Sequence, residues 1–270
     1  MVRLKGKVAV VTGASRGIGR AMALGLAREG ASVVVAAKST DRAPNPKLPG
    51  TIDSVAREIE ALGSKALAVK TDVRKIADVE AMIKQALAAF GKIDILVNNA
   101  ALPWWHSMLE TDEKHFDRVL LTQCKGPFFA IRAALPSMIA QKYGYIVNIS
   151  PPIAPKMAVG KIAYMIAKFG QTIISHALAE EVKEHNIAVA SLWPETLVES
   201  YAVIGLGLGS KEQWRKADIM ADALVALVTS DWAKVTGKVW KDEEILKEVG
   251  INDFSKYACV PGTEPIKIPW

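Results

Sequence analysis

The sequence predicts an α/β protein with a doubly wound, seven-stranded parallel sheet that carries helices on both faces. Short runs rich in β-branched residues alternate with helical stretches along most of the chain. The strand-like runs are continuously apolar, as in strands that are buried on both faces of a parallel sheet. Right-handed connections between such strands wind the intervening helices onto both faces.

Strands are expected at the apolar runs, and helices where apolar residues recur at helical spacing. Ile52, Val55 and Ile59, for example, share one face of a helix. The predicted strands are residues 7–12, 32–37, 65–70, 93–97, 145–150, 187–193 and 237–240. The predicted helices are residues 18–28, 52–62, 76–90, 112–138, 161–184 and 211–228, the fourth bent near Pro127 because proline lacks a backbone N–H.

The chain shows no change of composition over this pattern, so we expect one catalytic domain over residues 1–241. Two segments look like additions to it. Residues 39–50 contain three prolines and are expected to form an ordered loop. Residues 242–270 form a C-terminal extension that could cover a neighbouring surface or a partner subunit.

Composition and charge exclude several classes of protein. Of the 270 residues, 50% are hydrophobic and 23% are charged, which is typical of a globular protein and argues against disorder. The net charge of +6 comes from basic residues scattered among acids, so no nucleic-acid partner is expected. No apolar run reaches the roughly 18 residues that span a bilayer, and the N-terminus lacks a signal-peptide pattern. We expect neither a membrane span nor secretion.

Cysteine and histidine usage indicates a reducing compartment and no metal site. The two cysteines, Cys124 and Cys259, lie far apart, and the four histidines show no ligand spacing with cysteines or acids. Two free thiols are typical of a cytoplasmic protein.

Glycines crowd the turn after the first strand, Thr12-Gly-Ala-Ser-Arg-Gly-Ile-Gly19. Glycine permits a tight turn and a close approach to a pyrophosphate, and the following helix offers free N–H groups and its positive dipole end. No Lys-Ser or Lys-Thr pair follows, so this is not a nucleoside-triphosphate loop. The turn predicts the dinucleotide site of a single-domain Rossmann fold. The loop residues assigned to it are Gly13, Ser15, Arg16, Gly17, Ile18 and Gly19.

The end of the second strand favours NADP(H) over NAD(H). An acid at this position would bind the ribose hydroxyl of NAD, but here the strand ends in Ala37-Lys38-Ser39. A cation at Lys38 suits the 2′-phosphate of NADP, and Arg16 could add a second cation. The alternative is that Lys38 is simply solvated.

Tyr164 is the one tyrosine with a lysine four residues later, and both lie in a predicted helix, so Tyr164 and Lys168 share a face. Free tyrosine has a pKa near 10, and a nearby ammonium favours tyrosinate and lowers this pKa. The phenol could then exchange a proton with an alcohol while a hydride moves to or from nicotinamide.

The glycine motif, Asn98-Asn99-Ala100 after the fourth strand and Tyr164-x-x-x-Lys168 together resemble the short-chain dehydrogenase/reductase family. The resemblance covers about residues 5–240. It implies a nicotinamide cofactor, a homodimer or homotetramer, Tyr164 as the acid/base, and Lys168 bound to the nicotinamide ribose. It also implies that Asp72 contacts the adenine and that Asn98 holds the strand and the cofactor. The further implied cofactor contacts are Val73, Asn99, Ala100 and Pro194, although the usual Pro-Gly is Pro194-Glu195 here.

A narrower resemblance is to the branch that holds hydroxysteroid dehydrogenase-like protein two and citronellol dehydrogenase-type members. It rests on the proline-bearing loop, on Asn148-Ile-Ser-Pro-Pro152, on Leu192-Trp-Pro194 and on residues 253–262 of the tail.

Two further positions depart from the family pattern. Gln123 stands where the family usually has the asparagine of Asn-x-x-Gly, which helps to hold a proton-relay water. Gln123 either keeps this relay on a longer arm or is a plain helix residue. Pro151 stands where the family usually has its catalytic serine, so Ser150, one residue earlier, either orients the substrate carbonyl or has a structural role at the strand end.

Apolar residues predict an apolar substrate pocket. Trp104 and Trp105 follow the fourth strand, and Met157, Trp193 and the glycine-rich residues 198–208 could complete the walls. The leading hypothesis is an NADP(H)-dependent oxidoreductase that interconverts a small apolar alcohol and its ketone or aldehyde. The alternatives are a catalytically weak NADP-binding sensor or partner protein, and a lyase or dehydratase on the same scaffold.

Overall fold

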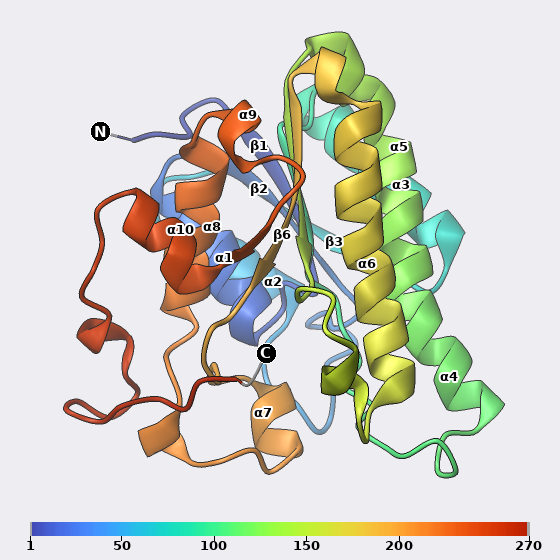
Figure 1. The fold of residues 1–270 in the computed structure, drawn as a ribbon. Coiled ribbons are helices and arrows are strands. Elements are labelled where there is room, and N and C mark those ends of the chain that lie inside the picture. Colours follow the sequence, from blue (N-terminus) through green and yellow to red (C-terminus); the bar gives the residue numbers. More distant parts are fainter. Residues whose placement is uncertain (1, 269–270) are drawn as a thin grey trace.

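Within residues 2–268, which the computed structural model describes, seven strands form one parallel sheet in the order β3-β2-β1-β4-β5-β6-β7 (Figure 1). The strands are β1 (Val8–Thr12), β2 (Ser32–Ala37), β3 (Ala66–Lys70), β4 (Ile95–Asn98), β5 (Gly144–Ile149), β6 (Ile187–Trp193) and β7 (Val239–Lys241). The order reverses between β1 and β4, which confirms the predicted doubly wound sheet. A ligand crevice is expected at the carboxyl ends of these two strands.

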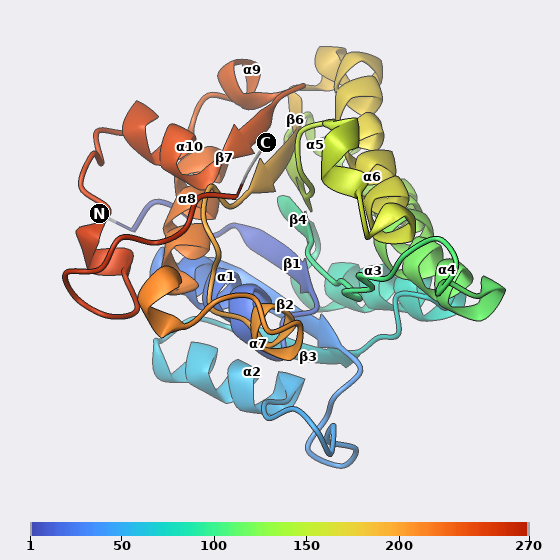
Figure 2. The ribbon, with the colours of Figure 1, turned by 60° about the horizontal axis from the view of Figure 1, so that its bottom comes forward.

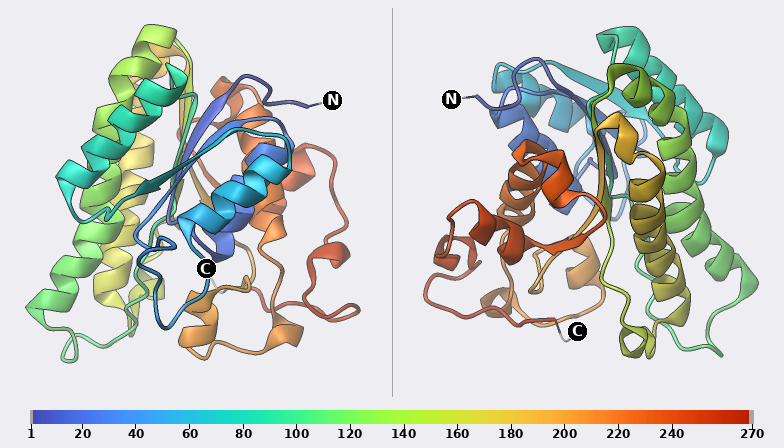
Figure 3. Two further views of the ribbon diagram at one scale, coloured as in Figure 1. Left: turned by 180° about the vertical axis from the view of Figure 1, so that it is seen from behind. Right: turned by 45° about the horizontal axis from the view of Figure 1, so that its top comes forward.

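Helices cover both faces of the sheet, as predicted (Figures 1 and 3). One face carries α1 (Gly17–Arg28), α2 (Ile52–Ala61), α8 (Asp218–Thr229) and α10 (Asp242–Glu248). The other carries α3 (Ile76–Phe90), α5 (Gly126–Gln141) and α6 (Ile162–Glu181). Because successive strand residues point to opposite faces, Ala9 and Val11 of β1 join the first core and Val10 joins the second. In the described part of the chain, no helix is long and apolar enough to cross a membrane.

The helix predicted over residues 112–138 is interrupted. It consists of α4 (Glu113–Leu120), a π-helical turn (Leu121–Lys125) and α5. In the π-turn, the Gly126 N–H reaches back to the carbonyl of Leu121. Pro127 has no N–H, so it cannot pair with the carbonyl of Gln123 as a regular α-helix requires. The bend predicted near Pro127 therefore takes the form of a wider turn just before it.

The helix predicted over residues 211–228 begins later than expected. Residues Lys211–Gln213 form a short 3₁₀ turn, and α8 starts only at Asp218. Between them the chain is extended, and Arg215 forms β-bridges to Val198 and Ala258. The short helices α7 (Tyr201–Gly205) and α9 (Trp232–Val235) were not predicted, because neither is long enough to show a helical periodicity.

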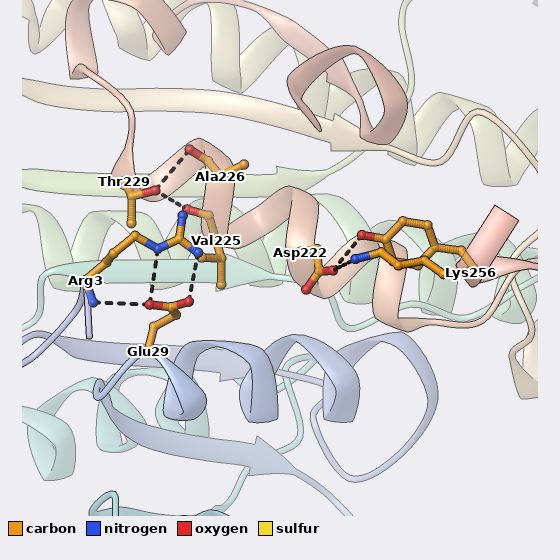
Figure 4. Close-up of polar contacts among 8 residues, drawn as sticks. Arg3, Glu29, Asp222, Val225, Ala226, Thr229 and Lys256 are labelled. Carbon is orange, nitrogen blue, oxygen red and sulfur yellow. Dashed lines mark hydrogen bonds and ion pairs between the residues drawn. The ribbon is translucent and has the colours of Figure 1, made fainter. Parts of the chain in front are cut away.

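The C-terminal extension packs on its own chain. Helix α10 buries Ile245 and Leu246 against α8, and farther along Lys256 and the hydroxyl of Tyr257 bind Asp222 of α8 (Figure 4). The N-terminal segment is held similarly by the pairing of Arg3 with Glu29 (Figure 4).

The end of the extension lies along the segment that follows β6. The Leu197 N–H donates to the Ile266 carbonyl (3.1 Å), and the Ile268 N–H donates to the Glu195 carbonyl (2.9 Å). This pairing brings the extension to the same end of the sheet as α7 (Figure 2). The extension therefore reaches the side of the molecule where the strands end.

Candidate active site

The turn between β1 and α1 is shaped by glycine and fastened to the end of β4. Gly13 has a φ of +68°, and a Cβ added to it would lie 2.8 Å from the Cα of Ala100, so the close approach of the two loops requires glycine. The Thr12 hydroxyl accepts hydrogen bonds from the N–H groups of Asn99 (3.0 Å) and Ala100 (3.2 Å). The Asn99 amide donates to the Thr12 carbonyl (2.9 Å).

A cavity of about 360 Å³ lies at this turn and extends to the ends of β2 and β3. The predicted cofactor contacts that line it are Gly13, Ser15, Arg16, Gly17, Ile18, Gly19, Lys38, Asp72, Val73, Asn99 and Ala100. Asn98 does not line the cavity. Its side chain is 1% exposed and donates to the Asn148 amide oxygen (2.9 Å), so it joins β4 to β5.

Basic side chains gather in this cavity. Lys38, Arg16, Arg74 and Arg118 all contribute to its wall. Burial lowers the pKa of Lys38, and the positive charges of Arg74, Arg118 and Arg16 lower it further, while Asp72 opposes them. Asp72 is itself paired with Arg74 (2.5 Å), whose hydrogen bonds hold the pKa of that carboxyl below its usual value. The surplus of positive charge suits an anionic ligand.

Sequence reasoning missed two of these four cations. Arg74 follows Asp72 by two residues, and this proximity was a usable signal. Arg118 belongs to α4 and reaches the cavity only through the fold. Asn45 and Leu48 of the proline-bearing loop also line the cavity and were not predicted.

Arg16 holds the proline-bearing loop over the cavity. Its Nε donates to the Pro49 carbonyl (2.7 Å), and one Nη donates to the Ser39 hydroxyl (2.8 Å) and the Gly50 carbonyl (2.8 Å). Burial lowers the pKa of the guanidinium. Arg16 therefore both shapes the wall and adds charge to it.

A second cavity of about 180 Å³ adjoins the first. The two share part of their walls, at Ile18, Asn99, Ala101, Pro103, Ser200 and Ala202. The second cavity is mostly apolar and contains Tyr164 and Lys168, as well as the predicted wall residues Trp105, Met157 and Trp193. Pro194, assigned to the cofactor from sequence, lines this second cavity. Ile268 of the C-terminal extension lines it too, which was not foreseen.

Not all of the predicted pocket residues take part. Trp104 does not line the second cavity; its ring stacks on His115 with a centroid distance of 3.9 Å. Trp105 instead packs edge-on against Tyr164, with a centroid distance of 6.3 Å. The glycine-rich segment contributes through Val198, Val203, Leu206 and Leu208.

Tyr164 and Lys168 are both buried, and burial dominates their ionisation. The Lys168 ammonium donates to the Ile149 carbonyl (2.5 Å) and to the Gln171 amide oxygen (3.2 Å), and burial lowers its pKa to about 7. Burial raises the pKa of Tyr164. The lowering of the Tyr164 pKa that the sequence predicts from Lys168 is therefore not seen in the protein by itself, where burial of the phenol acts in the opposite direction.

Ser150 does not line the second cavity. It is fully buried, its hydroxyl is 2.8 Å from that of Ser191, and it accepts a hydrogen bond from Thr172 (3.0 Å). The chain of hydrogen bonds continues through Ser175 to Asn148. The structure therefore does not bring Ser150 to the substrate side, because its hydroxyl is used to join β5, β6 and α6.

Gln123 lies in the π-turn, which packs against α6. It is fully buried, and neither its amide nitrogen nor its amide oxygen has a hydrogen-bond partner within residues 2–268. A buried amide without partners costs about 1–3 kcal/mol, and an ordered water commonly satisfies it. Gln123 does not line either cavity.

Residues 7–200 match the short chain dehydrogenase family, and the chain belongs to this family. The family and the fold agree with the prediction from the motifs. Hydroxysteroid dehydrogenase-like protein 2 from human and from Xenopus laevis are each 43% identical to this chain over 263 residues. The match covers 96% of this chain and 62% of each relative, so the chain spans about three fifths of these relatives. The predicted resemblance to this branch is confirmed.

Solved structures agree with this placement. A short chain dehydrogenase from Mycobacterium thermoresistibile is 38% identical with a TM-score of 0.91, over 99% of this chain and 95% of that chain. A metagenomic short-chain oxidoreductase in complex with NADP is 30% identical with a TM-score of 0.72, over 88% of this chain and 98% of that chain.

Proposed function

We propose that the protein is an NADP(H)-dependent oxidoreductase that interconverts an apolar alcohol and its ketone or aldehyde. The observation that carries this proposal is that Tyr164 lines an apolar cavity that adjoins the cavity at the glycine turn. A substrate in the apolar cavity has a phenol on one side and the nucleotide cavity on the other. This arrangement suits a proton and a hydride that add to the two ends of one carbonyl group.

The first cavity fits a phosphorylated dinucleotide. The glycine turn leaves backbone open to a pyrophosphate, and the cations of Lys38, Arg74 and Arg118 offer partners for the 2′-phosphate. No acid stands at the end of β2, where NAD would need one for its ribose hydroxyl. A family member with NADP bound, at 30% identity, supports the same choice.

Tyr164 is assigned the proton transfer. When bound, the nicotinamide supplies or accepts the hydride. The raised pKa keeps the phenol protonated, so Tyr164 can donate its proton to the carbonyl oxygen during reduction. In the reverse oxidation, the deprotonated Tyr164 would accept the proton of the alcohol. In its protonated form, Lys168 has three N–H groups and uses two of them on Ile149 and Gln171, which leaves one for the ribose.

Ser150 and Gln123 are assigned positioning roles. Ser150 holds the ends of β5 and β6 to α6 through its hydroxyl contacts and so fixes the helix that carries Tyr164. Gln123 holds an ordered water that supplies protons toward α6. Its unpartnered amide and the packing of the π-turn against α6 support this role.

A catalytically weak NADP-binding protein is the second candidate. Its support is that Pro151 offers no hydroxyl to the cavity, that Ser150 does not line the cavity, and that Gln123 replaces the usual asparagine. Such a protein would bind the dinucleotide as a sensor or as part of a complex.

We further propose a homodimer or homotetramer in the cytoplasm. Helices α5 and α6 expose Phe128 (50%), Ile166 (46%) and Ile173 (56%), which supports a contact between copies of this chain. Cys124 and Cys259 are free thiols, which supports a reducing compartment.

The test is a titration with NADPH and with NADH, followed by a screen of apolar ketones and aldehydes for loss of absorbance at about 340 nm. The proposal expects tighter binding of NADPH and turnover of at least one carbonyl compound. Tight NADPH binding without turnover of any carbonyl or alcohol would favour the second candidate.

A further inference from the structure

The second cavity contains positive charge without a matching acid. Besides Lys168, its wall includes the ammonium of Lys161, and among the described residues none of its lining side chains is a carboxylate. Lys161 is the N-cap residue of α6, three residues before Tyr164, and both residues line this cavity.

Trp105 joins these two side chains. The Lys161 Nζ lies 4.0 Å from the centroid of the Trp105 ring, and Trp105 also packs edge-on against Tyr164. Lys161 is half-buried, and within residues 2–268 no carboxylate pairs with it. Burial lowers its pKa, and no nearby acid offsets this effect. The ring attracts the cation, but such a contact replaces only part of the lost hydration.

We propose that the substrate carries a carboxylate, or an anion of similar shape, that pairs with Lys161 while its apolar body lies between Trp105, Met157 and Trp193. This inference rests on the proposed function and narrows its substrate class from apolar carbonyl compounds to oxo acids with an apolar body. Lys161 thereby acts as a specificity-determining residue. Lys161 selects anionic over neutral substrates, because an ion pair in a largely apolar cavity is weakly screened.

The experiment compares carboxylates with neutral compounds of the same shape. The reducible probes are 3- and 4-formylbenzoate and the corresponding formylbenzamides, with NADPH as the reductant. The wild-type enzyme is expected to favour at least one acid over its amide by about tenfold or more in kcat/KM. Lys161→Met is expected to bring this ratio to about one, mainly through KM, and Lys161→Arg is expected to keep it.

Lys156→Met is the matched control. Lys156 is exposed, lies on the neighbouring 3₁₀ turn and does not line the cavity. Its removal lowers the general positive potential by the same charge and is expected to leave the acid-to-amide ratio unchanged. An equal fall of the acid-to-amide ratio in Lys161→Met and Lys156→Met would overturn the proposal. So would a Lys161→Met variant that loses activity equally on the acid and on the amide, because Lys161 would then be a donor to the reacting carbonyl.

A binding measurement separates this inference from the proposed reaction. Calorimetry of 4-ethylbenzoate and 4-ethylbenzamide with the NADP⁺-loaded protein needs no hydride transfer. The inference expects the acid to bind about tenfold more tightly, and Lys161→Met to remove the difference. If no carbonyl compound is reduced but this preference holds, the reaction fails and the anion site stands. Equal binding of acid and amide, or no binding of either, overturns the anion site even if turnover is found.

Discussion

The Lys168 Nζ donates a hydrogen bond of 2.5 Å to the backbone carbonyl oxygen of Ile149, the last residue of β5. This contact fastens the helix that carries Tyr164 to the end of the central sheet. It also fixes a cation in a fully buried place, and burial lowers its pKa to about 7. The position of this lysine therefore links the stability of the fold to pH.

Lys168 is expected to make the protein more stable as the pH rises from about 7 toward 10. In this window the unfolded chain, with a lysine pKa of 10.5, binds a proton that the folded chain does not, so unfolding becomes less favourable as the pH increases. Below pH 7 the cost of the buried ammonium is fully present.

The measurement is urea unfolding of the wild-type protein and Lys168→Met across this range. The difference in the free energy of unfolding, wild type minus variant, is expected to increase by at least about 1 kcal/mol between pH 7 and 9.5. Stability curves that run parallel would contradict the burial of a titrating lysine.

Lys38 is expected to select NADPH. Lys38→Ala removes one of the cations around the proposed 2′-phosphate site, so the Kd for NADPH should rise about tenfold while the Kd for NADH stays nearly constant. Lys47→Ala is the control, because Lys47 is exposed on the same proline-bearing loop and does not line the cavity. If Lys38→Ala weakens both dinucleotides equally, the phosphate assignment is wrong.

Ser150→Ala is expected to affect stability more than activity. It removes hydroxyl contacts to Ser191 and Thr172, which should lower the free energy of unfolding by about 1–3 kcal/mol. Because Ser150 does not line the cavity, kcat/KM should fall by less than about tenfold. A serine that held the reacting carbonyl would instead cost about a hundredfold or more in kcat at unchanged stability.

Gln123→Leu tests the proposed relay water. Because both amide atoms lack protein partners, leucine should leave the free energy of unfolding within about 1 kcal/mol of the wild type. Loss of the water should lower kcat about tenfold and enlarge the solvent deuterium isotope effect. Gln123→Asn is expected to keep both near the wild-type values. An unchanged kcat in Gln123→Leu would make Gln123 a plain helix residue.

The fold could be predicted because its signals are local and repeated. Valine-rich runs predict the strands β1 and β2 directly, and the glycines between β1 and α1 predict the tight turn there. Helix α7 escaped prediction because it is too short to show a helical periodicity. The extended chain around Arg215 escaped prediction because bridges to distant residues, such as Ala258, determine its structure. The same holds for the C-terminal extension, whose place depends on its pairing with residues 195–197.

The candidate site divides in the same way. Gly13, Lys38 and Tyr164 were found because motif spacing and strand ends mark them in the sequence. Arg118 and Lys161 were missed, because only the packing of α4 and α6 brings their charges to the cavities. For Ser150 the sequence left two roles open, orientation of the substrate and a structural role at the strand end, because side-chain contacts at a strand end depend on partners such as Ser191 that no local pattern reveals.

The central claim, proton transfer by Tyr164, is tested most directly by Tyr164→Phe. Turnover of the best carbonyl compound with NADPH and the Kd for NADPH are measured on the same preparation. We expect kcat to fall by at least about a hundredfold, because the phenol proton is lost, while the Kd stays within about threefold of the wild-type value. Substantial turnover by the variant with normal NADPH binding would contradict the assignment of Tyr164 as the acid/base.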